Sequence, residues 1–221
     1  MWIRLTPSII LTLLLLQTTQ PVTQPEGPFE NEIQAFEQAD RKQPPPKNAV
    51  EFVGSSSIRF WGTLAQDFPH IPVINRGFGG SQIEDSTRYA DRIIIPYHPR
   101  QIVFYAGDND LAAGKTPEQV LAEFQAFVKK VRAALPDVRI SFISIKPSLA
   151  RWRLIEQIKK ANQRIQDFVK KEKNIDYIDI FTPMLGPDGK PRAELFRPDG
   201  LHVNQKGYEL WTSIIAPKLQ G

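Results

Sequence analysis

A serine cluster and an Asp-x-x-His pair are the groups in this sequence best suited to acyl-transfer chemistry. Ser55–Ser57 follow a short apolar run and precede a helical segment, a position that exposes a hydroxyl beside free helix N–H groups. Asp199 and His202 share a turn with Pro and Gly, where the carboxylate could reach Nδ1 of the imidazole and leave Nε2 as a base. Together they predict a serine nucleophile with a histidine base. Helix capping by serine and ordinary turn chemistry are the alternative explanations.

Two further segments could donate hydrogen bonds to a developing oxyanion. Gly77, Gly79 and Gly80 occupy three of four consecutive positions, and glycine permits the positive φ that turns a backbone N–H toward a ligand. Asn109 follows another apolar run and could donate from its carboxamide. A tight turn would explain either segment as well. A dinucleotide-binding fingerprint would need glycine where the chain has Gln82, which disfavours that function.

The segments that must position these groups alternate between strand-like and helix-like patterns. Short runs rich in β-branched and aromatic residues predict strands over residues 50–53, 72–75, 101–106, 139–145 and 175–180. Helical spacing of apolar residues predicts helices over residues 29–42, 58–67, 83–94, 154–169 and 205–219, and one that begins after Thr116. The strands are too apolar to face water, so they predict a parallel sheet with helices on both faces. Ligands bind at the carboxyl ends of such strands, where the motifs lie.

The composition restricts the partners and cofactors of this chain. Its 221 residues are 41% hydrophobic and 24% charged, which is typical of one water-soluble domain with a full core. The absence of cysteine excludes disulfides and thiolate metal sites, and a net charge of +4 is too small to indicate nucleic-acid binding. Residues 129–173 hold 13 Lys and Arg against 4 Asp and Glu. This basic face is either a solvated helix exterior or a surface for anionic groups such as phospholipid headgroups.

The N-terminal segment has the pattern of a targeting signal. Arg4 precedes an apolar run over residues 9–16, which is too short to span a bilayer and fits the core of a signal peptide over residues 1–20. Export to the periplasm or the exterior is therefore expected, and an uncleaved membrane tether is the alternative. Residues 21–47 are interpreted as a Pro-rich lead-in with a short helix, and residues 48–221 as the folded domain.

Four motifs occur in the order FVGSSS, NRGFGG, GDND and DGLH, and this set resembles the SGNH (GDSL-type) hydrolase superfamily. The resemblance extends over residues 48–219. It implies a three-layer α/β/α sandwich with a flavodoxin-like parallel sheet of about five strands. It also implies a serine esterase that works through an acyl-enzyme, with no metal and no organic cofactor.

The same resemblance implies a triad and an oxyanion hole. The nucleophile, the base and the acid that orients the base correspond to Ser56, His202 and Asp199. The oxyanion donors correspond to the N–H groups of Ser56 and Gly80 and to the side chain of Asn109.

Ser55 departs from the family pattern, because it stands where the family usually has Asp. This departure puts the support of the nucleophile turn in question and leaves open a binding module without turnover. A flavodoxin-type cofactor binder is favoured by fold alone. The family includes lysophospholipase-like, platelet-activating-factor acetylhydrolase-like and carbohydrate-acetyl esterases, so the expected substrate is a short acyl ester of a lipid or carbohydrate. Four side chains beside the motifs are expected to line its pocket: Phe78, Leu111, Phe196 and Arg197.

Overall fold

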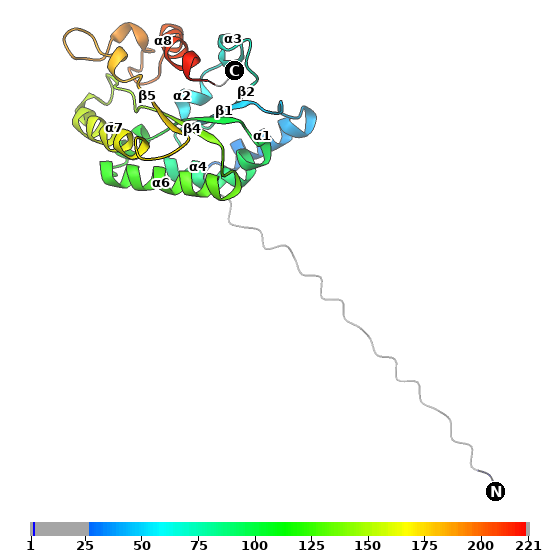
Figure 1. Cartoon of the computed structure of the whole chain (residues 1–221). Helices are drawn as coiled ribbons and strands as arrows, with labels where there is room; N and C mark the ends of the chain where they lie inside the picture. The colour runs from blue at the N-terminus through cyan, green and yellow to red at the C-terminus, as the bar shows by residue number, and fades with distance from the viewer. Residues whose placement is uncertain (1, 3–26, 220–221) are drawn as a thin grey trace.

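A five-stranded parallel sheet forms the centre of the computed structural model, which describes residue 2 and residues 27–219 (Figure 1). Its strands are β1 (Val50–Gly54), β2 (Val73–Gly77), β3 (Gln101–Tyr105), β4 (Arg139–Ile143) and β5 (Ile175–Ile178). The order β2-β1-β3-β4-β5, with every neighbouring pair parallel, is that of flavodoxin-like folds. The signal peptide expected over residues 1–20 lies outside the described residues apart from residue 2.

Helices cover both faces of the sheet and complete the α/β/α sandwich that the sequence predicts (Figure 1). One face carries α1 (Glu30–Lys42), α4 (Ile83–Ile93), α6 (Pro117–Ala134) and α7 (Ile155–Val169). The other carries α2 (Ser56–Arg59), α3 (Leu64–Asp67) and α8 (Gln205–Ile215). The short α5 (Asp108–Ala112) follows β3, and 3-10 turns occupy residues 95–97, 152–154, 182–184, 193–195 and 216–218. Within the described ranges, every helix is too short or too polar to cross a membrane.

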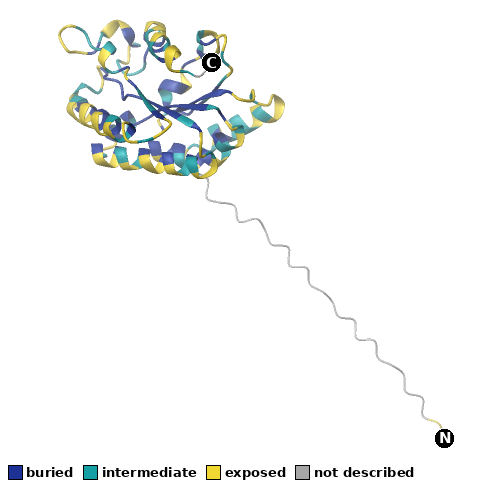
Figure 2. Ribbon diagram, viewed as in Figure 1, coloured by how far each residue is buried: buried dark blue, intermediate teal, exposed yellow. Residues whose placement is uncertain are grey.

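Side chains from alternate strand positions fill two separate cores. Phe104 faces the α6 side, where its ring stacks on Phe127 with centroids 4.3 Å apart. Phe52 faces the α8 side and meets Trp61 edge to face at 5.6 Å. Burying a side chain of this size stabilises the fold by roughly 1.5–3 kcal/mol. The sheet is accordingly the most buried part of the molecule, in dark blue in Figure 2, and it gives the site a rigid base.

The single helix predicted over residues 58–67 is wrong, because the chain forms the two short helices α2 and α3 there. Gly62 lies between them, and glycine is a poor helix former. Trp61 is buried and donates its indole N–H to Oδ2 of Asp67 at 2.6 Å, which holds the chain in a bend. Tertiary packing therefore overrides the local helical pattern.

Other predicted elements are present with changed bounds: the strands expected over residues 50–53 and 72–75 extend to Gly54 and Gly77, whereas several others are shorter. The helix expected over residues 205–219 ends at Ile215 and continues as a 3-10 turn, because Pro217 has no N–H to extend α-helical bonding. The strands expected to end at residues 106, 145 and 180 end one or two residues earlier, at residues 105, 143 and 178. The segments beyond β3 and β4 carry residues of the site, among them Asn109 and Arg151.

α1 packs into the same body as the sheet. Ile33 is fully buried in the core, and Arg92 of α4 pairs with Glu30 at 2.8 Å and with Glu37 at 2.7 Å. Exposed or partly exposed ion pairs contribute little stability, so the buried apolar contact is the stronger attachment. α1 is therefore held against α4 close to the loops that follow β1 and β2.

Two glycines let three loops leave the sheet side by side. Gly54, Gly77 and Tyr105 are paired in register at the carboxyl ends of β1, β2 and β3. Gly54 has a φ of 140°, and a Cβ there would lie 1.8 Å from the Tyr105 carbonyl oxygen. A Cβ on Gly77 would lie 2.2 Å from the backbone nitrogen of Arg59 in α2. Glycine is therefore required at both positions. The loops that carry three of the motifs leave the sheet at the same edge, the carboxyl ends of β1, β2 and β3.

Candidate active site

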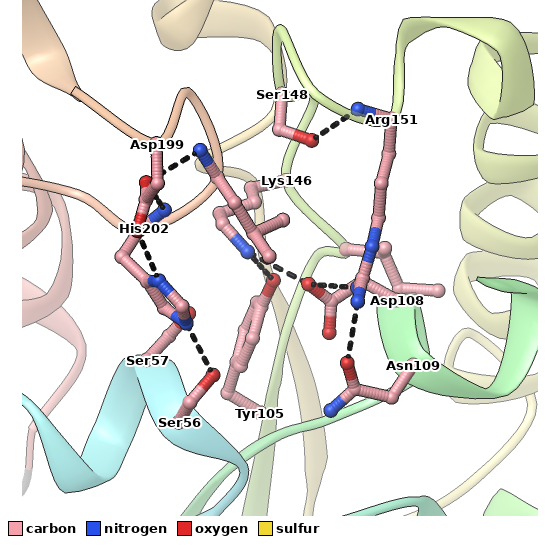
Figure 3. Close-up of polar contacts among 12 residues, drawn as sticks. Ser56, Ser57, Tyr105, Asp108, Asn109, Lys146, Ser148, Arg151, Asp199 and His202 are labelled. Carbon is pink, nitrogen blue, oxygen red and sulfur yellow. Dashed lines mark hydrogen bonds and ion pairs between the residues drawn. The ribbon is translucent and has the colours of Figure 1, made fainter. Parts of the chain in front are cut away.

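Ser56, His202 and Asp199 form one hydrogen-bonded chain at the carboxyl edge of the sheet (Figure 3). The Nε2 atom of His202 lies 3.0 Å from Oγ of Ser56, and Nδ1 lies 2.7 Å from Oδ2 of Asp199. Ser56 is the first residue of α2, whereas the other two residues come from the loop before α8. The structure thus brings together, across 146 positions of sequence, the three residues that the motifs predict as a triad.

Exposure distinguishes Ser56 from the serines on either side. Ser55 and Ser57 are each 1% exposed, whereas Ser56 is half-buried. The Ser56 hydroxyl is also the one that hydrogen-bonds to the imidazole of His202. Access and geometry therefore both favour Ser56 as the reactive hydroxyl.

Local hydrogen bonds place the Asp199 carboxylate against His202. Its Oδ1 atom accepts from the backbone N–H groups of Leu201 and His202 at 2.8 and 2.9 Å, and this turn is aided by Gly200 at a φ of 63°. Burial opposes ionisation, but the hydrogen bonds from the His202 side chain and from these two N–H groups lower the pKa of Asp199 to about 2. Asp199 is therefore a carboxylate at neutral pH, suited to orient an imidazole and to stabilise its charged form.

The two predicted oxyanion segments meet at Ser81. The Nδ2 atom of Asn109 donates to the carbonyl of Ser81, the residue after Gly80, at 2.9 Å. Gly80 has a φ of 79°, and the space beside its α-carbon is open. Ser81 closes the turn by donating its hydroxyl to the carbonyl of Phe78 at 2.9 Å. The Asn109 side chain is thus hydrogen-bonded to the residue that directly follows Gly80.

Glu32 of α1 links this glycine turn to α2. Its Oε1 atom accepts from the N–H of Gly79 at 3.2 Å and from Nη1 of Arg59 at 2.8 Å. Arg59 lies one turn after Ser56, so one carboxylate contacts both the glycine turn and the helix of the nucleophile. No local pattern points to Glu32, because 27 and 47 positions separate it from its two partners.

A buried ion cluster beside the triad is also absent from the sequence-based predictions (Figure 3). The Nζ atom of Lys146 lies 2.7 Å from Oδ2 of Asp108 and 3.0 Å from the hydroxyl of Tyr105. Arg151 places Nη1 3.0 Å from the same Asp108 oxygen and donates Nη2 to Oδ1 of Asn109 at 2.8 Å. A lysine close behind a buried strand is the signal that could have revealed the cluster, because lysine is almost never buried without a partner.

A family model connects this geometry to known proteins. The model of the GDSL-like lipase/acylhydrolase family matches residues 51–210, more than half of the chain. The chain belongs to this family. The match includes β2–β5, all of β1 except Val50, and the four motifs, whereas α1 with Glu32 lies before it.

Solved structures share the fold of this GDSL-like protein at low sequence identity. A protein provisionally assigned as a platelet activating factor from Streptococcus pneumonia is 20% identical, with a TM-score of 0.76 over 86% of this chain and 92% of that one. A GDSL-like lipase from Bacteroides thetaiotaomicron is 20% identical, with a TM-score of 0.72 over 84% and 96%. A carbohydrate esterase family 3 protein from Talaromyces cellulolyticus is 19% identical, with a TM-score of 0.63 over 76% and 95%. A comparison with curated proteins finds no significant match.

Backbone hydrogen bonds hold the turn in which Ser55 replaces the Asp usual in GDSL-like proteins. The Ser55 N–H donates to the Tyr105 carbonyl at 3.0 Å, and the Ser55 carbonyl accepts from the N–H of Ile58 at 2.9 Å. Tyr208 of α8 adds a bond from its hydroxyl to the Ser57 carbonyl at 3.0 Å. The turn is therefore supported by β3 and α8 without an acid at position 55.

Three of the four side chains expected to line the pocket of this GDSL-like protein are core residues instead. Phe78, Leu111 and Phe196 are 0%, 1% and 6% exposed. Phe78 lies within NRGFGG, Leu111 directly follows GDND, and Phe196 precedes DGLH by three residues. Phe78, for example, packs edge to face on Phe29 at 5.2 Å. Arg197 alone of the four is half-buried, and it lies at the rim of the site.

The rim of the site carries two exposed apolar side chains. Phe60 is 37% exposed and meets the imidazole of His202 edge to face at 4.9 Å. Arg197 lies over this Phe60 ring, with the central carbon of its guanidinium 4.9 Å from the ring centroid. Leu149 is 43% exposed and precedes Ala150, whose N–H donates to the Gly200 carbonyl at 3.0 Å. The triad is thus bordered by apolar surface.

The cations of the basic face, residues 129–173, are largely paired. Lys146 and Arg151 belong to the buried cluster rather than to the surface. Ion pairs with carboxylates hold a further set: Lys130, Arg132, Arg139, Lys159, Arg164 and Lys170. This pairing reduces the positive field that the face presents to solvent.

Proposed function

We propose that this chain is a serine hydrolase of short-acyl carboxylic esters that acts through an acyl-enzyme on Ser56. The observation that carries the proposal is the chain of hydrogen bonds at 3.0 and 2.7 Å from Ser56 through His202 to Asp199. A serine hydroxyl is a weak nucleophile unless a base within hydrogen-bond reach takes its proton. His202 meets that requirement, and Asp199 fixes the ring so that Nε2 faces the hydroxyl.

The first half-reaction transfers the acyl group to the enzyme. The Ser56 Oγ atom attacks the ester carbonyl carbon as its proton moves to Nε2 of His202, and the carbonyl π electrons move to the oxygen. Asp199, with a pKa of about 2, stays ionised and stabilises the imidazolium. Collapse of the intermediate breaks the ester C–O bond, and His202 gives its proton to the departing alcohol oxygen.

The second half-reaction releases the acid. Water attacks the acyl-enzyme as His202 takes its proton, and collapse of the second intermediate returns that proton to Oγ of Ser56. In both intermediates the proposed oxyanion donors are the N–H groups of Ser56 and Gly80 and the side chain of Asn109. Removing one such donor typically lowers the rate by about 10²–10³.

The loops around Ser56 favour small acyl groups. α2 starts directly after Ser55, and α5 starts directly after Gly107, so these loops do not extend over the serine. Phe60 and Leu149 offer apolar surface to an acyl or alcohol group. Among the similar structures are a GDSL-like lipase and a carbohydrate esterase, so lipid and carbohydrate esters are both candidates. A panel of p-nitrophenyl esters from acetate to palmitate, with acetylated oligosaccharides and lysophospholipids, separates these classes by kcat/KM.

A fluorophosphonate probe tests the nucleophile, because it forms a stable adduct with an activated serine. We expect a single adduct, mapped to Ser56 by peptide mass spectrometry, and none in Ser56→Ala. Ser57→Ala is the matched control, since that hydroxyl is buried and the variant should still be labelled. An adduct on Ser55 or Ser57 would contradict the assignment. A wild-type protein without any adduct would favour a binding module on the same fold.

A further inference from the structure

Asn109 can serve an oxyanion only if its carboxamide presents nitrogen rather than oxygen to the substrate. The two ends of a carboxamide are nearly equal in shape, so its hydrogen-bond partners decide the orientation. Nδ2 of Asn109 donates to the Ser81 carbonyl at 2.9 Å, and Oδ1 accepts from Nη2 of Arg151 at 2.8 Å. A carbonyl only accepts and a guanidinium only donates, so reversal of the amide would break both bonds. The second Nδ2 hydrogen remains for a ligand.

Arg151 is itself held by the buried ion cluster (Figure 3). Its Nη1 atom lies 3.0 Å from Oδ2 of Asp108, and Nζ of Lys146 lies 2.7 Å from the same oxygen. The backbone N–H of Arg151 donates to the Ser148 hydroxyl at 3.3 Å. The Lys146 side chain is 1% exposed and that of Asp108 7%, so the groups that anchor the guanidinium are shielded from solvent.

The ionisation of this cluster leaves an excess positive charge beside Asn109. Burial alone would raise the pKa of Asp108, but Lys146 and Arg151 lower it below its ordinary value. Burial alone would lower the pKa of Lys146, but Asp108 and Tyr105 raise it above its ordinary value. Two cations therefore face one carboxylate. Such a positive charge, held by a buried cluster, favours a developing oxyanion beside it.

We propose that Arg151 is a positioning residue for ester hydrolysis, which locks the Asn109 carboxamide with its nitrogen toward the oxyanion. The inference rests on the proposed function, because it requires Asn109 to act as an oxyanion donor. Arg151 contacts Asn109 and Asp108 rather than the reacting atoms, so it acts through Asn109. Its contribution should therefore appear in kcat and should vanish when Asn109 is removed.

Steady-state kinetics of Arg151→Met on p-nitrophenyl acetate test the proposal. Methionine keeps an unbranched side chain but has no donor for Asn109. We expect kcat to fall by about 10-fold to 100-fold, below the range of about 10²–10³ for complete loss of a donor, with KM changed by less than about threefold. Arg151→Lys keeps a charge beside Asp108 but lacks the fork that reaches both partners, so it should recover part of kcat. Arg153→Met, at an exposed arginine two positions later, should match the wild type.

A double-mutant comparison separates positioning from a general structural role. Adding Arg151→Met to Asn109→Ala should lower kcat by less than about twofold, since each change removes the same interaction, the hydrogen bond between Arg151 and Asn109. The proposal would be overturned if the kcat losses of the two single variants multiplied in the double variant. It would also be overturned if Arg151→Met kept the wild-type kcat or changed only KM. If thermal unfolding shows that Arg151→Met does not fold, Arg151→Lys carries the same comparison. If the wild type is labelled by fluorophosphonate but the variants give one of these contrary outcomes, only the role of Arg151 is refuted. If the wild type is neither labelled nor active, the proposed function itself is refuted.

Discussion

Two buried aspartates flank Asn109 in the sequence, and their pKa values shift in opposite directions. The side chains of Asp108 and Asp110 are 7% and 0% exposed, and such burial disfavours the charged form of both. Two cations beside Asp108 outweigh burial and lower its pKa below the ordinary value. Burial raises the pKa of Asp110 to about 7, and a hydrogen bond with the carboxyl group of Glu123 adds to the shift. Neighbouring charges, rather than burial, therefore explain why the two pKa values shift in opposite directions.

The two aspartates also support different parts of the site. Asp108 stays anionic and anchors Arg151. Asp110 accepts the N–H of Ile83 at 3.1 Å, at the first residue of α4, the helix that follows the glycine turn. Asp108 thus supports the Asn109 side chain by charge, through Arg151, whereas Asp110 supports the start of α4 by a hydrogen bond that a protonated carboxyl group can still accept.

Replacing Asp108 should give the largest loss of stability. Asp108→Asn leaves Lys146 and Arg151 without a countercharge, and breaking a buried pair in this way costs about 3–5 kcal/mol. Asp110→Asn is the matched control, because its nearest cation, Lys115, is 3.8 Å away, and we expect a change below about 1 kcal/mol. Urea unfolding at neutral pH measures both. Equal losses would show that burial, rather than the neighbouring charges, distinguishes the two positions.

The stability contributed by Asp110 should fall as the pH rises. With a raised pKa, the folded state retains a proton that the unfolded state releases, so the contribution is complete below the ordinary pKa of 3.8 and is lost through about 7. The slope for one proton is at most about 1.4 kcal/mol per pH unit. Asp108 has the opposite sign, because its lowered pKa stabilises the fold above its ordinary value and less as the pH falls.

Urea unfolding of the wild type and of Asp110→Asn across the range from acid to neutral pH checks this sign. The two free-energy curves should diverge at low pH, where the wild type gains the contribution of the protonated Asp110. Parallel curves would mean that folding does not raise the pKa of Asp110.

Removing Glu123 should have the smallest effect. Glu123→Gln takes away the carboxyl partner of Asp110, so the pKa of Asp110 should move below about 7 yet stay raised, because burial is the larger cause. Stability at neutral pH should change by less than about 1 kcal/mol, since Lys115 keeps Glu84 as a partner at 3.0 Å. Carbon-13 NMR of the Asp110 carboxyl group follows the titration. Glu84→Gln is the control and should move it less; equal shifts would contradict the role of Glu123.

Much of the fold and of the site was predictable from local sequence. Five apolar runs with strand-like composition correspond to β1–β5, since a buried parallel strand needs apolar side chains on both faces. Ser56 and Asn109 stand next to strand ends, and parallel strands bring those ends to one edge. Asp199 and His202 are close in sequence, so their hydrogen bond is a property of one turn. These features depend on near neighbours in the chain.

The sequence by itself thus determined the layers, the order of the motifs and the Asp199–His202 turn, because periodicity and turn chemistry act over a few residues. Only the tertiary structure decided which serine is accessible and which charges surround Asn109. Arg151 lies 42 positions from Asn109 and Lys146 lies 38 from Asp108. The energy of a buried charge depends on the partners that the folded sheet places within a few ångströms, and no local pattern encodes those distances.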